Sequence, residues 1–548
     1  ISQSNTNNSS YSLRGQLSYS DVYREIHRFS VLAGAEIRGE KAEGIFEKRY
    51  GYDPVTGNSA MPVPKDPGNG EGFKYSDLVS YANAMDQLSG QEIEENRFAS
   101  FYGALDYSLF DRYVLNVSFR TDGSNNFGSD EQFNPTWSAG AVWHVSEETF
   151  MEVVRPVLSR LSLRVATGYT GNINKTVKPN LMMKYYKNFR ISDDENYRMG
   201  YINNAPNPKL RWEKTRDVKV ALDFGLWKDR INGIVEAYWR KSKDCVTSEY
   251  VPVTTGFFNQ SYNTSVLQNN GVEFSLSVAV LKSKDYNLSV SANVAWNQNK
   301  LKKYNSPNTS LALDKYVGYP MGAVFSGKYE GIDPETGMYK FKLRPDAVTN
   351  KDGYLREPNN YYYYLGTSVA PFTGGFNLNF SYKNIGLSYS VKAKMVDNIE
   401  SPAGYELLSG SKLESIPTPH NDLYRNHLNV KREVRNRWTP ENRTGVKYPR
   451  LIDAYGKKLG LDLTNPTLTT ITRGALLEDI SYLRINTIAL SYSLPQRVLE
   501  RINFSSAALN LTLNNFFTIT KYSGIDPEVP GATYPVSRSV TIGLNVGF

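Results

Sequence analysis

The C-terminal stretch Ser539-Val-Thr-Ile-Gly-Leu-Asn-Val-Gly-Phe548 decides the fold class of this chain. Val540, Ile542 and Leu544 alternate in it with small or polar residues. A period of two is typical of a β-strand with one apolar face. A chain that ends on an aromatic residue, at the end of such a strand, is typical of a bacterial outer-membrane barrel. Phe548 is therefore the candidate C-terminal residue of the strand that closes the barrel during assembly.

The same alternation recurs along the chain in segments of about ten residues, long enough to cross a bilayer as tilted strands. It predicts about fifteen strands, near residues 10–19, 27–38, 97–110, 113–122, 135–145, 160–169, 216–226, 230–241, 270–281, 286–297, 373–383, 386–396, 480–493, 506–517 and 536–548. Short helical pieces are expected at 147–159 and 495–505, and a short helix at 76–88.

The connections between these strands alternate in length. Tight turns alternate with connections that include four very long ones, at 39–96, 170–215, 298–372 and 397–479. Membrane barrels keep short turns on the periplasmic side and long loops outside, whereas a soluble β-sandwich does not produce this regular asymmetry. We therefore expect an all-β, transmembrane antiparallel β-barrel.

Composition agrees with this fold class. The 548 residues are 40% hydrophobic and 13% aromatic, yet mean hydropathy is −0.48. No apolar run approaches the roughly 18 residues of a membrane helix, so a helical membrane protein is excluded. Cys245 is the single cysteine and excludes an internal disulfide framework. With four histidines and no CxxC motif, neither a metal site nor a cofactor is expected.

Several other patterns are interpreted as ordinary loop chemistry. The net charge of +8 is spread over the loops, and its densest cluster, at 431–437, is interpreted as a solvated loop rather than as a nucleic-acid site. The segments at 53–57 and 333–337 resemble fragments of calcium loops but lack the repeated ligands, so we interpret them as turns. The spacing of His420 and His427 would place both side chains on one face of a helix as possible metal ligands, but the prolines before His420 argue against a helix there.

Blocks of residues that follow one another along almost the whole chain resemble one protein family. They include RTDGSNNF at 120–127, NPKLRWEKT at 207–215, YLGTSVAPFTGGFNLNFSYKN at 364–384, YLRINTIALSYSLP at 482–495 and NNFFTITKYSGIDPE at 514–528. The chain resembles the C-terminal barrel of the SusC/RagA-type TonB-dependent transporters of Bacteroidetes.

The resemblance implies a barrel of about 22 strands, of which residues 1–548 supply the C-terminal part. The signal peptide, TonB box, N-terminal extension and plug domain of such transporters are not recognised in this chain. An open sheet leaves two edges in lipid, where each unpaired backbone group costs several kcal/mol. We therefore expect the plug and about seven further strands to come from a second polypeptide or from an N-terminal segment outside this chain.

The function implied by the resemblance is energy-coupled import of oligosaccharides or peptides across the outer membrane. The implied partners are a SusD-like surface lipoprotein that acts as a lid and the TonB–ExbB–ExbD system, which acts on the plug. A passive outer-membrane porin or an adhesin barrel is the alternative. An outer-membrane enzyme is not expected, because no nucleophile or acid–base set is found.

Candidate ligand residues are polar and aromatic residues of the long outer loops, since aromatic faces stack on sugar rings or peptide side chains. They are Tyr354, Tyr361, Tyr362, Tyr363, Tyr364, His420, Tyr424, Trp438 and Tyr455. The alternative is that these aromatics pack the loops against one another or against the lid. Tyr361 to Tyr364 equally fit the start of an interfacial strand. Tryptophans near strand ends are assigned to the interfacial girdle, namely Trp143, Trp227, Trp239 and Trp296.

Overall fold

The computed structural model describes most of the chain. The described residues are 2–48, 53–56, 58, 89–174, 177–192, 195–257, 259–304, 316–337, 339–346, 360–395, 399–400, 435–446, 448–449, 473–522, 524–530 and 534–548. No helix among them is long and apolar enough to span a membrane. The helix expected at 76–88 lies outside the described residues.

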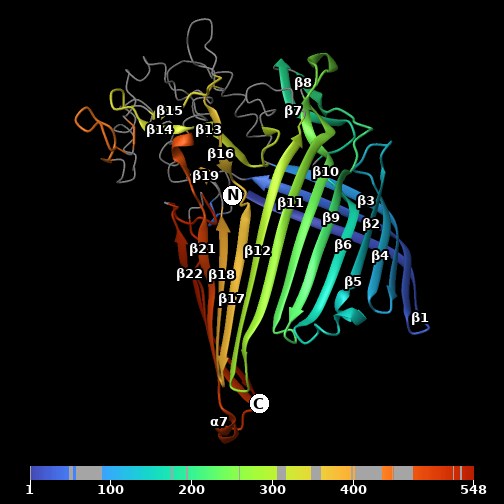
Figure 1. Cartoon of the computed structure of the whole chain (residues 1–548). Coiled ribbons are helices and arrows are strands. Elements are labelled where there is room, and N and C mark those ends of the chain that lie inside the picture. The colour runs from blue at the N-terminus through green and yellow to red at the C-terminus, as the bar shows by residue number, and fades with distance from the viewer. Residues whose placement is uncertain are drawn as a thin grey trace.

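One antiparallel sheet of 15 strands dominates the structure (Figure 1). Its strands follow one another in chain order, so each pairs with the sheet strands before and after it. They are β1 (Ser2–Tyr23), β2 (His27–Lys48), β3 (Ser89–Leu109), β4 (Tyr113–Ser124), β5 (Phe133–His144), β6 (Leu158–Asn172), β9 (Glu213–Leu226), β10 (Ile231–Tyr250), β11 (Asn259–Lys282), β12 (Tyr286–Lys303), β17 (Phe372–Tyr382), β18 (Ile385–Met395), β21 (Tyr482–Ser493), β22 (Ser506–Thr520) and β23 (Ser539–Gly547). Each overlaps a predicted strand, which confirms the predicted fold class.

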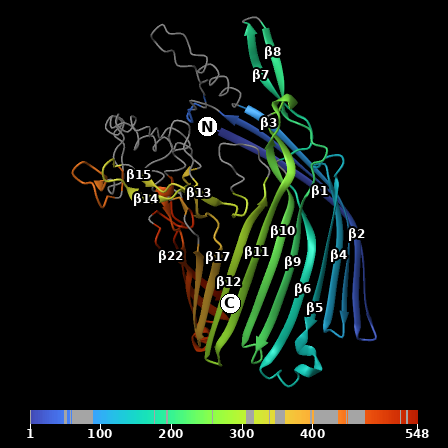
Figure 2. The ribbon, with the colours of Figure 1, turned by 45° about the horizontal axis from the view of Figure 1, so that its top comes forward.

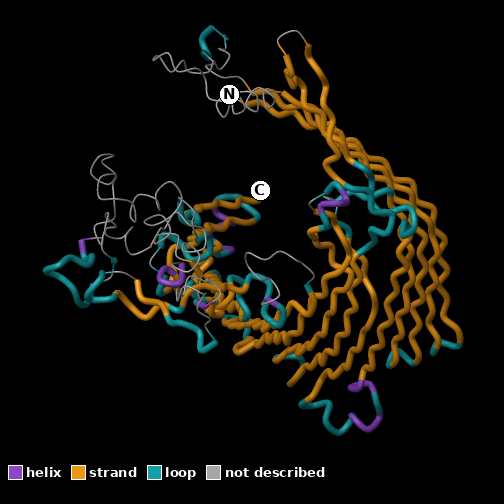
Figure 3. Tube along the Cα trace, turned by 90° about the horizontal axis from the view of Figure 1, so that it is seen from above, coloured by secondary structure: helices purple, strands orange, loops and turns teal. Residues whose placement is uncertain are grey.

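The sheet bends into an open, curved wall (Figures 2 and 3). β1 and β23 stand at its two ends, and the described part of the chain contains no pairing between them. Figure 1 shows the short turns and helix α7 (Gln496–Arg501) at one end of the wall and the long connections at the other. The short-turn end corresponds to the periplasmic side of an outer-membrane barrel.

The long connections contain small strand pairs that periodicity did not predict. They are β7 (Met182–Ser192) with β8 (Glu195–Asn204), β13 (Ala323–Gly327) with β16 (Tyr362–Thr367), β14 (Tyr329–Ile332) with β15 (Tyr339–Phe341), and β19 (Ile399–Glu400) with β20 (Leu477–Glu478). All lie above the long-loop end of the wall (Figure 1). Most of these strands are too short to show a period of two in the sequence.

Several strands extend well beyond their predicted ends. The predicted strands 27–38 and 97–110 become β2 and β3, whose pairing is unbroken from His27 and Leu109 to Glu47 and Ser89. The added part of β2 is mostly polar, with Ile45 and Phe46 as exceptions, and carries the ion pair Lys41–Glu43 at 2.5 Å. Apolar alternation therefore stops where the strand leaves the bilayer, while backbone pairing continues into the external solvent.

Short helical pieces occur where they were expected at the periplasmic end. The region 147–159 holds the 3-10 helix η2 (Thr149–Met151), and the 3-10 helix η1 (Val145–Glu147) ends at its first residue. The region 495–505 holds α7, which Pro495 precedes with φ of −63°. Proline fixes φ near the helical value, so it suits the first turn of a helix.

The register places apolar side chains on one face of the sheet. Residues that pair directly across neighbouring strands share a face. One such row, across β5 to β12, is Trp143, Leu163, Leu222, Val235, Phe274 and Val294. Most of these side chains are exposed. So large an exposed apolar surface indicates contact with lipid, and we name it the lipid face.

Residues that alternate with the lipid face are mostly polar or small. On β12, Ser289, Ser291 and Asn293 lie between Leu288, Val290, Ala292 and Val294. This second face is named the lumen face, because barrel strands alternate between apolar side chains toward lipid and polar side chains toward an aqueous interior.

Two neighbouring residues of β12 test this assignment. Val290 pairs with Val278 and Leu378 on the lipid face, while Ser291 pairs with Ser277 and Asn377 on the lumen face. Val290→Lys is expected to destabilise the folded barrel by about 2–4 kcal/mol, the cost of a lysine near the bilayer midplane. Ser291→Lys is expected to cost much less. Urea titration of the complete barrel refolded into vesicles measures both, and equal losses would contradict the face assignment.

Candidate functional site

The lumen face of β6, β9 and β10 is densely charged. Arg164 pairs with Asp223 at 2.6 Å, Lys219 with Glu236 at 3.1 Å, and Arg240 with Asp217 at 2.8 Å. Each pair joins neighbouring strands, and its carboxylate is the less exposed partner. We name these residues the charged wall. Paired charges can line a water-filled interior without the cost of an isolated buried ion.

Similar pairs continue the charged lumen face into β1 to β4. The Arg14 guanidinium lies 2.9 Å from Glu36, and Arg120 lies 2.7 Å from Asp122. Ser100 donates to Asp122 and accepts from Arg120 at 2.9 Å. Charged pairs therefore occur on the lumen face of β1 to β4 and of β6, β9 and β10, whereas the lumen face of β5, from Asn134 to His144, carries no Lys, Arg, Asp or Glu.

The lumen face changes character in the C-terminal strands. Three neighbouring rows across β12, β17, β18, β21, β22 and β23 contain no charged residue and none larger than asparagine. They are Asn287, Ser381, Gly386, Ser491, Asn510 and Gly543; Ser289, Asn379, Ser388, Ala489, Thr512 and Thr541; and Ser291, Asn377, Ser390, Thr487, Asn514 and Ser539. We name these rows the neutral wall.

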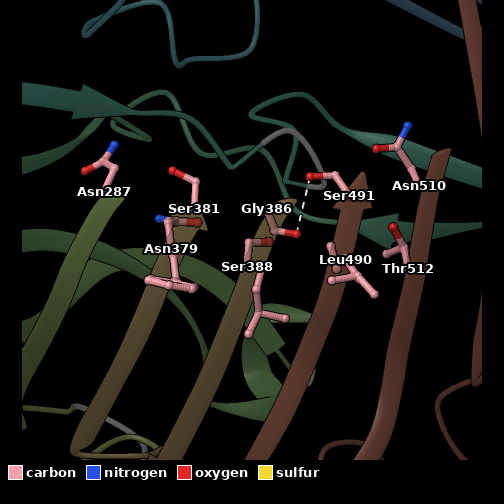
Figure 4. Close-up of a pocket in the computed structure, with 12 residues that line it drawn as sticks. Asn287, Asn379, Ser381, Gly386, Ser388, Leu490, Ser491, Asn510 and Thr512 are labelled. Carbon is pink, nitrogen blue, oxygen red and sulfur yellow. Dashed lines mark hydrogen bonds between the residues drawn. The ribbon is translucent and has the colours of Figure 1, made fainter. Parts of the chain in front are cut away.

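A pocket of about 350 Å³ lies on the neutral wall (Figure 4). Asn287, Asn379, Ser388, Asn510 and Thr512 are among its lining residues. A second pocket, of about 550 Å³, continues toward the long loops and is lined by residues that include Thr487, Asn514 and Ser539. Ala489 lines the first pocket, and Thr487, two residues earlier in β21, is the next residue on the same face toward the long loops. The two pockets therefore follow one another along β21 and β22.

An ion-pair cluster closes the outer end of the neutral wall. Arg484 on β21 is 1% exposed; its guanidinium lies 2.5 Å from Asp526 and 3.0 Å from Glu528. The Asp526 carboxylate accepts the backbone N–H groups of Glu528 and Val536, at 2.9 and 3.0 Å. Burial raises the pKa of Asp526, but these hydrogen bonds and the Arg484 charge outweigh it, so the net pKa is lowered.

The same turn chemistry recurs in the two segments that resembled calcium loops. Asp53 accepts the backbone N–H of Val55 at 2.9 Å, and Asp333 accepts that of Glu335 at 2.8 Å. These contacts are Asx turns, in which an aspartate side chain caps the backbone two residues later. They agree with the prediction that both segments are turns. Within the described residues, no group of three or more His, Cys, Asp or Glu could hold a metal ion.

Four of the candidate ligand residues, Tyr361 to Tyr364, lie at the strand pair β13–β16 above the wall. Tyr362 is buried, and the Tyr363 hydroxyl donates to the carbonyl of Leu343 at 2.8 Å. Tyr364 packs against Tyr319, with ring centroids 4.8 Å apart. Tyr361 is half-buried, and burial raises its pKa. β16 belongs to a two-stranded sheet in the loops, so these tyrosines do not begin a wall strand.

Trp438 holds two outer connections together. Its indole Nε1 donates to the carbonyl of Pro334 at 2.9 Å, and its backbone N–H donates to Tyr448 at 2.9 Å. The side chain is only 6% exposed. Tyr354, His420, Tyr424 and Tyr455, the remaining candidates, lie outside the described residues.

The four tryptophans assigned to the girdle are all exposed. Trp143 lies near the periplasmic end of β5, and Trp227 follows β9 directly. Trp239 and Trp296 lie within β10 and β12 on the lipid face, about eight to ten residues from the periplasmic ends of those strands, the length that crosses a bilayer. The sequence placed them near strand ends, but β10 and β12 continue past both.

Trp143 also has a polar partner at the periplasmic rim. Its indole N–H donates to Glu148 at 3.1 Å, and the Tyr113 hydroxyl donates to the same carboxylate at 2.6 Å. The Tyr113 hydrogen bond, followed by that of Trp143, lowers the pKa of Glu148. An aromatic body in lipid with a polar tip in water is the arrangement favoured at membrane interfaces.

Sequence reasoning missed the neutral wall and the Arg484 cluster. Each serine or asparagine of the neutral wall was visible as the polar half of an alternating strand. Their common property emerges only when the register aligns six strands that are distant in sequence. The signal available beforehand was that the polar positions of 286–293, 373–381 and 506–514 contain no charged residue.

The comparisons with known proteins agree with this architecture. The family model described as TonB dependent receptor-like, beta-barrel matches residues 2–399. The chain belongs to this family. Its members form outer-membrane receptor and transporter barrels and are not an enzyme family, so the receptor barrel described here lies in the bacterial outer membrane.

Alignments with individual relatives cover almost the whole of this chain. It is 26% identical to the TonB-dependent receptor SusC of Bacteroides thetaiotaomicron, over 95% of this chain and 48% of that protein. It is 25% identical to the TonB-dependent receptor P26 of Formosa agariphila, over 97% of this chain and 52% of that protein. The chain thus spans about half the length of these relatives. The structure of the RagAB peptide transporter shares the fold, with a TM-score of 0.77, 23% identity, and coverage of 100% of this chain and 56% of that one.

The substitution Trp438→Phe tests whether the hydrogen bond from Trp438 to Pro334 holds the two outer loops together. The substitution keeps an aromatic ring but removes the hydrogen bond to Pro334, which is expected to weaken the contact by about 1 kcal/mol. Hydrogen exchange of the complete protein should show faster exchange at 435–449. The matched control is Trp239→Phe on the lipid face, and equal exchange in the two variants would contradict the role of Trp438.

Acidification tests the Arg484 cluster. Asp526 has a lowered pKa in the folded state, so its contribution is present above the unfolded pKa, near about 3.9, and is lost as pH falls through the folded value. Protease cleavage within 521–538 is expected to rise below about pH 4. Asp526→Asn should already be cleaved faster at neutral pH, with a weaker dependence on pH. An unchanged acid profile in this variant would show that another group controls the loop.

Proposed function

We propose that this chain forms part of the wall of a TonB-dependent importer of the SusC/RagA type, which takes up oligosaccharides or peptides across the outer membrane. The observation that carries the proposal is the two-faced sheet, in which an apolar lipid face backs a polar lumen face that contains two pockets. A wall of this kind surrounds a solute path.

The proposal includes further strands that close the barrel. β1 and β23 end the sheet with backbone groups that the described residues do not pair. In lipid each unpaired group costs several kcal/mol, so membrane sheets close on themselves. We propose that about seven strands and a plug, on a second polypeptide or on an N-terminal segment, join β1 to β23. The plug is where the TonB–ExbB–ExbD system would act.

The long loops are proposed to meet a SusD-like lipoprotein lid and the incoming ligand. Aromatic groups gather on β13 to β16, where Tyr364, Tyr319 and Phe325 pack together. Tyr364 is exposed, whereas Tyr361 and Tyr363 are half-buried, so Tyr364 best suits contact with a ligand or a lid. Tyr362 and Trp438 would instead stiffen the loops that carry them. Tyr354, His420, Tyr424 and Tyr455 remain candidate ligand residues.

The four tryptophans are proposed to form two interfacial belts. Trp143 and Trp227 would mark the periplasmic boundary of the hydrocarbon layer, and Trp239 and Trp296 the outer boundary. Their exposure on the lipid side and their spacing along the strands support this assignment.

A passive porin is the second candidate function, favoured by the polar residues and pockets of the lumen face. Conductance of the purified native complex in a planar bilayer distinguishes the two. A plugged importer is expected to leave the bilayer almost silent and to take up solute in cells only when the inner membrane is energised. Large, steady channels, or uptake that persists without a proton gradient, would contradict the importer and support the porin.

A further inference from the structure

The lumen face differs in charge along the sheet, and two pockets lie on its uncharged part. Ion pairs recur from β1 to β10, whereas the neutral wall has no charged residue in its three rows. Two pockets of the lumen face lie over β12 to β23. Glu528 is the only charged residue in their linings, and Arg484 engages it.

Side-chain size explains why the hollows lie there. Arginine, lysine and glutamate side chains of the charged wall reach across to neighbouring strands and fill the space above the backbone. Serine, threonine and glycine leave that space open. The neutral wall is therefore the shallow side of the lumen face, along which a solute meets fewer protruding groups.

The neutral wall also offers unused hydrogen-bonding groups. Within the described part of the chain, the side-chain amides of Asn287, Asn379 and Asn510 make no hydrogen bond to protein. Figure 4 shows these amides on β12, β17 and β22 around the pocket. Each amide carries two donors and an acceptor. These amides recur across the strands of the neutral wall. A polar molecule that moves past can therefore break its hydrogen bond to one amide and form another with the next.

We propose that the neutral wall is the path along which solute crosses this barrel, and that the path favours uncharged, hydrogen-bonding solutes such as neutral oligosaccharides. This inference rests on the proposed import function and adds the location of the path and its selectivity. An ion entering the path would lose water without meeting an opposite charge, which is costly. The charged wall, with its fixed ion pairs, remains a static part of the lumen.

Two serines provide a matched pair of probes. Ser390 is the sixth residue of β18 and belongs to the neutral wall. Ser118 is the sixth residue of β4, lies on the lumen face and hydrogen-bonds to Ser138 at 2.6 Å. Both strands start at the periplasmic end, and both serines are half-buried. The variants Ser390→Cys and Ser118→Cys, in a Cys245→Ser background, place one thiol on each side of the lumen.

The experiment measures thiol labelling of the complete transporter in intact, energised cells. An uncharged maleimide is expected to label Ser390→Cys about tenfold faster than Ser118→Cys, because reagent that follows the solute path reaches the neutral wall more often. Sulfonated and trimethylammonium maleimides, corrected for their rates with free cysteine, should label Ser390→Cys several-fold more slowly than the uncharged reagent. Equal labelling of the two sites would overturn the location of the path, and equal rates for all three reagents would overturn its selectivity.

Uptake of a radiolabelled pool of malto-oligosaccharides gives a separate readout. After labelling with a bulky uncharged maleimide, Ser390→Cys should lose transport while Ser118→Cys retains it; the reverse would overturn the proposal. If the unmodified protein gives no energy-dependent uptake of any solute, the importer function itself fails. The labelling rates still decide whether the neutral wall is the accessible side.

Discussion

Backbone hydrogen bonding in lipid is the constraint on which the rest of this structure depends. A strand that crosses a hydrocarbon layer has no water to satisfy its N–H and C=O groups, so each must pair with a neighbouring strand. The chain meets this demand with a single antiparallel sheet in sequence order. Side chains then alternate between the two faces, so the sequence of every strand must alternate between apolar and polar residues. Half of the residues of each strand are therefore available to line an aqueous interior.

The lumen face uses that freedom unevenly. Where arginine, lysine, aspartate and glutamate occur, from β1 to β10, they are locked in ion pairs between strands. Where small uncharged residues occur, from β12 to β23, the surface is hollowed and carries unused amides. At the outer end, Arg484 and Asp526 tie the last long loop to β21. A fixed half and an open half of the same wall suit the proposed role, in which the barrel keeps its shape while a polar solute passes.

The membrane part of the fold could be predicted from the sequence because the bilayer imposes alternation. The segment 286–297 shows the pattern plainly, and β12 begins at Tyr286. Prediction failed where that constraint ends: the polar extension of β2 to Lys48 is held by backbone pairing that leaves no hydrophobic period. The strand pair β14–β15 is too short to show one.

The candidate site was less predictable. Aromatic content identified the outer loops but could not distinguish a residue that packs, such as Trp438, from a residue that remains accessible, such as Tyr364. That distinction depends on Pro334, a residue 104 positions away in the chain. The neutral wall required the alignment of six strands, because serine and asparagine are individually unremarkable polar residues of a barrel. Register, rather than residue type, creates that surface.

The central claim is that the sheet presents one face to lipid and the other to water across its full span. A spin-label scan of β12 from Asn287 to Asn297, in the complete protein in bilayers, tests it most directly. The account predicts alternating accessibility: labels at Leu288, Val290, Ala292, Val294 and Trp296 collide with oxygen dissolved in lipid, and labels at the residues between them collide with a water-soluble nickel complex. A uniform accessibility to the nickel complex, or a period near 3.6 residues, would contradict the account.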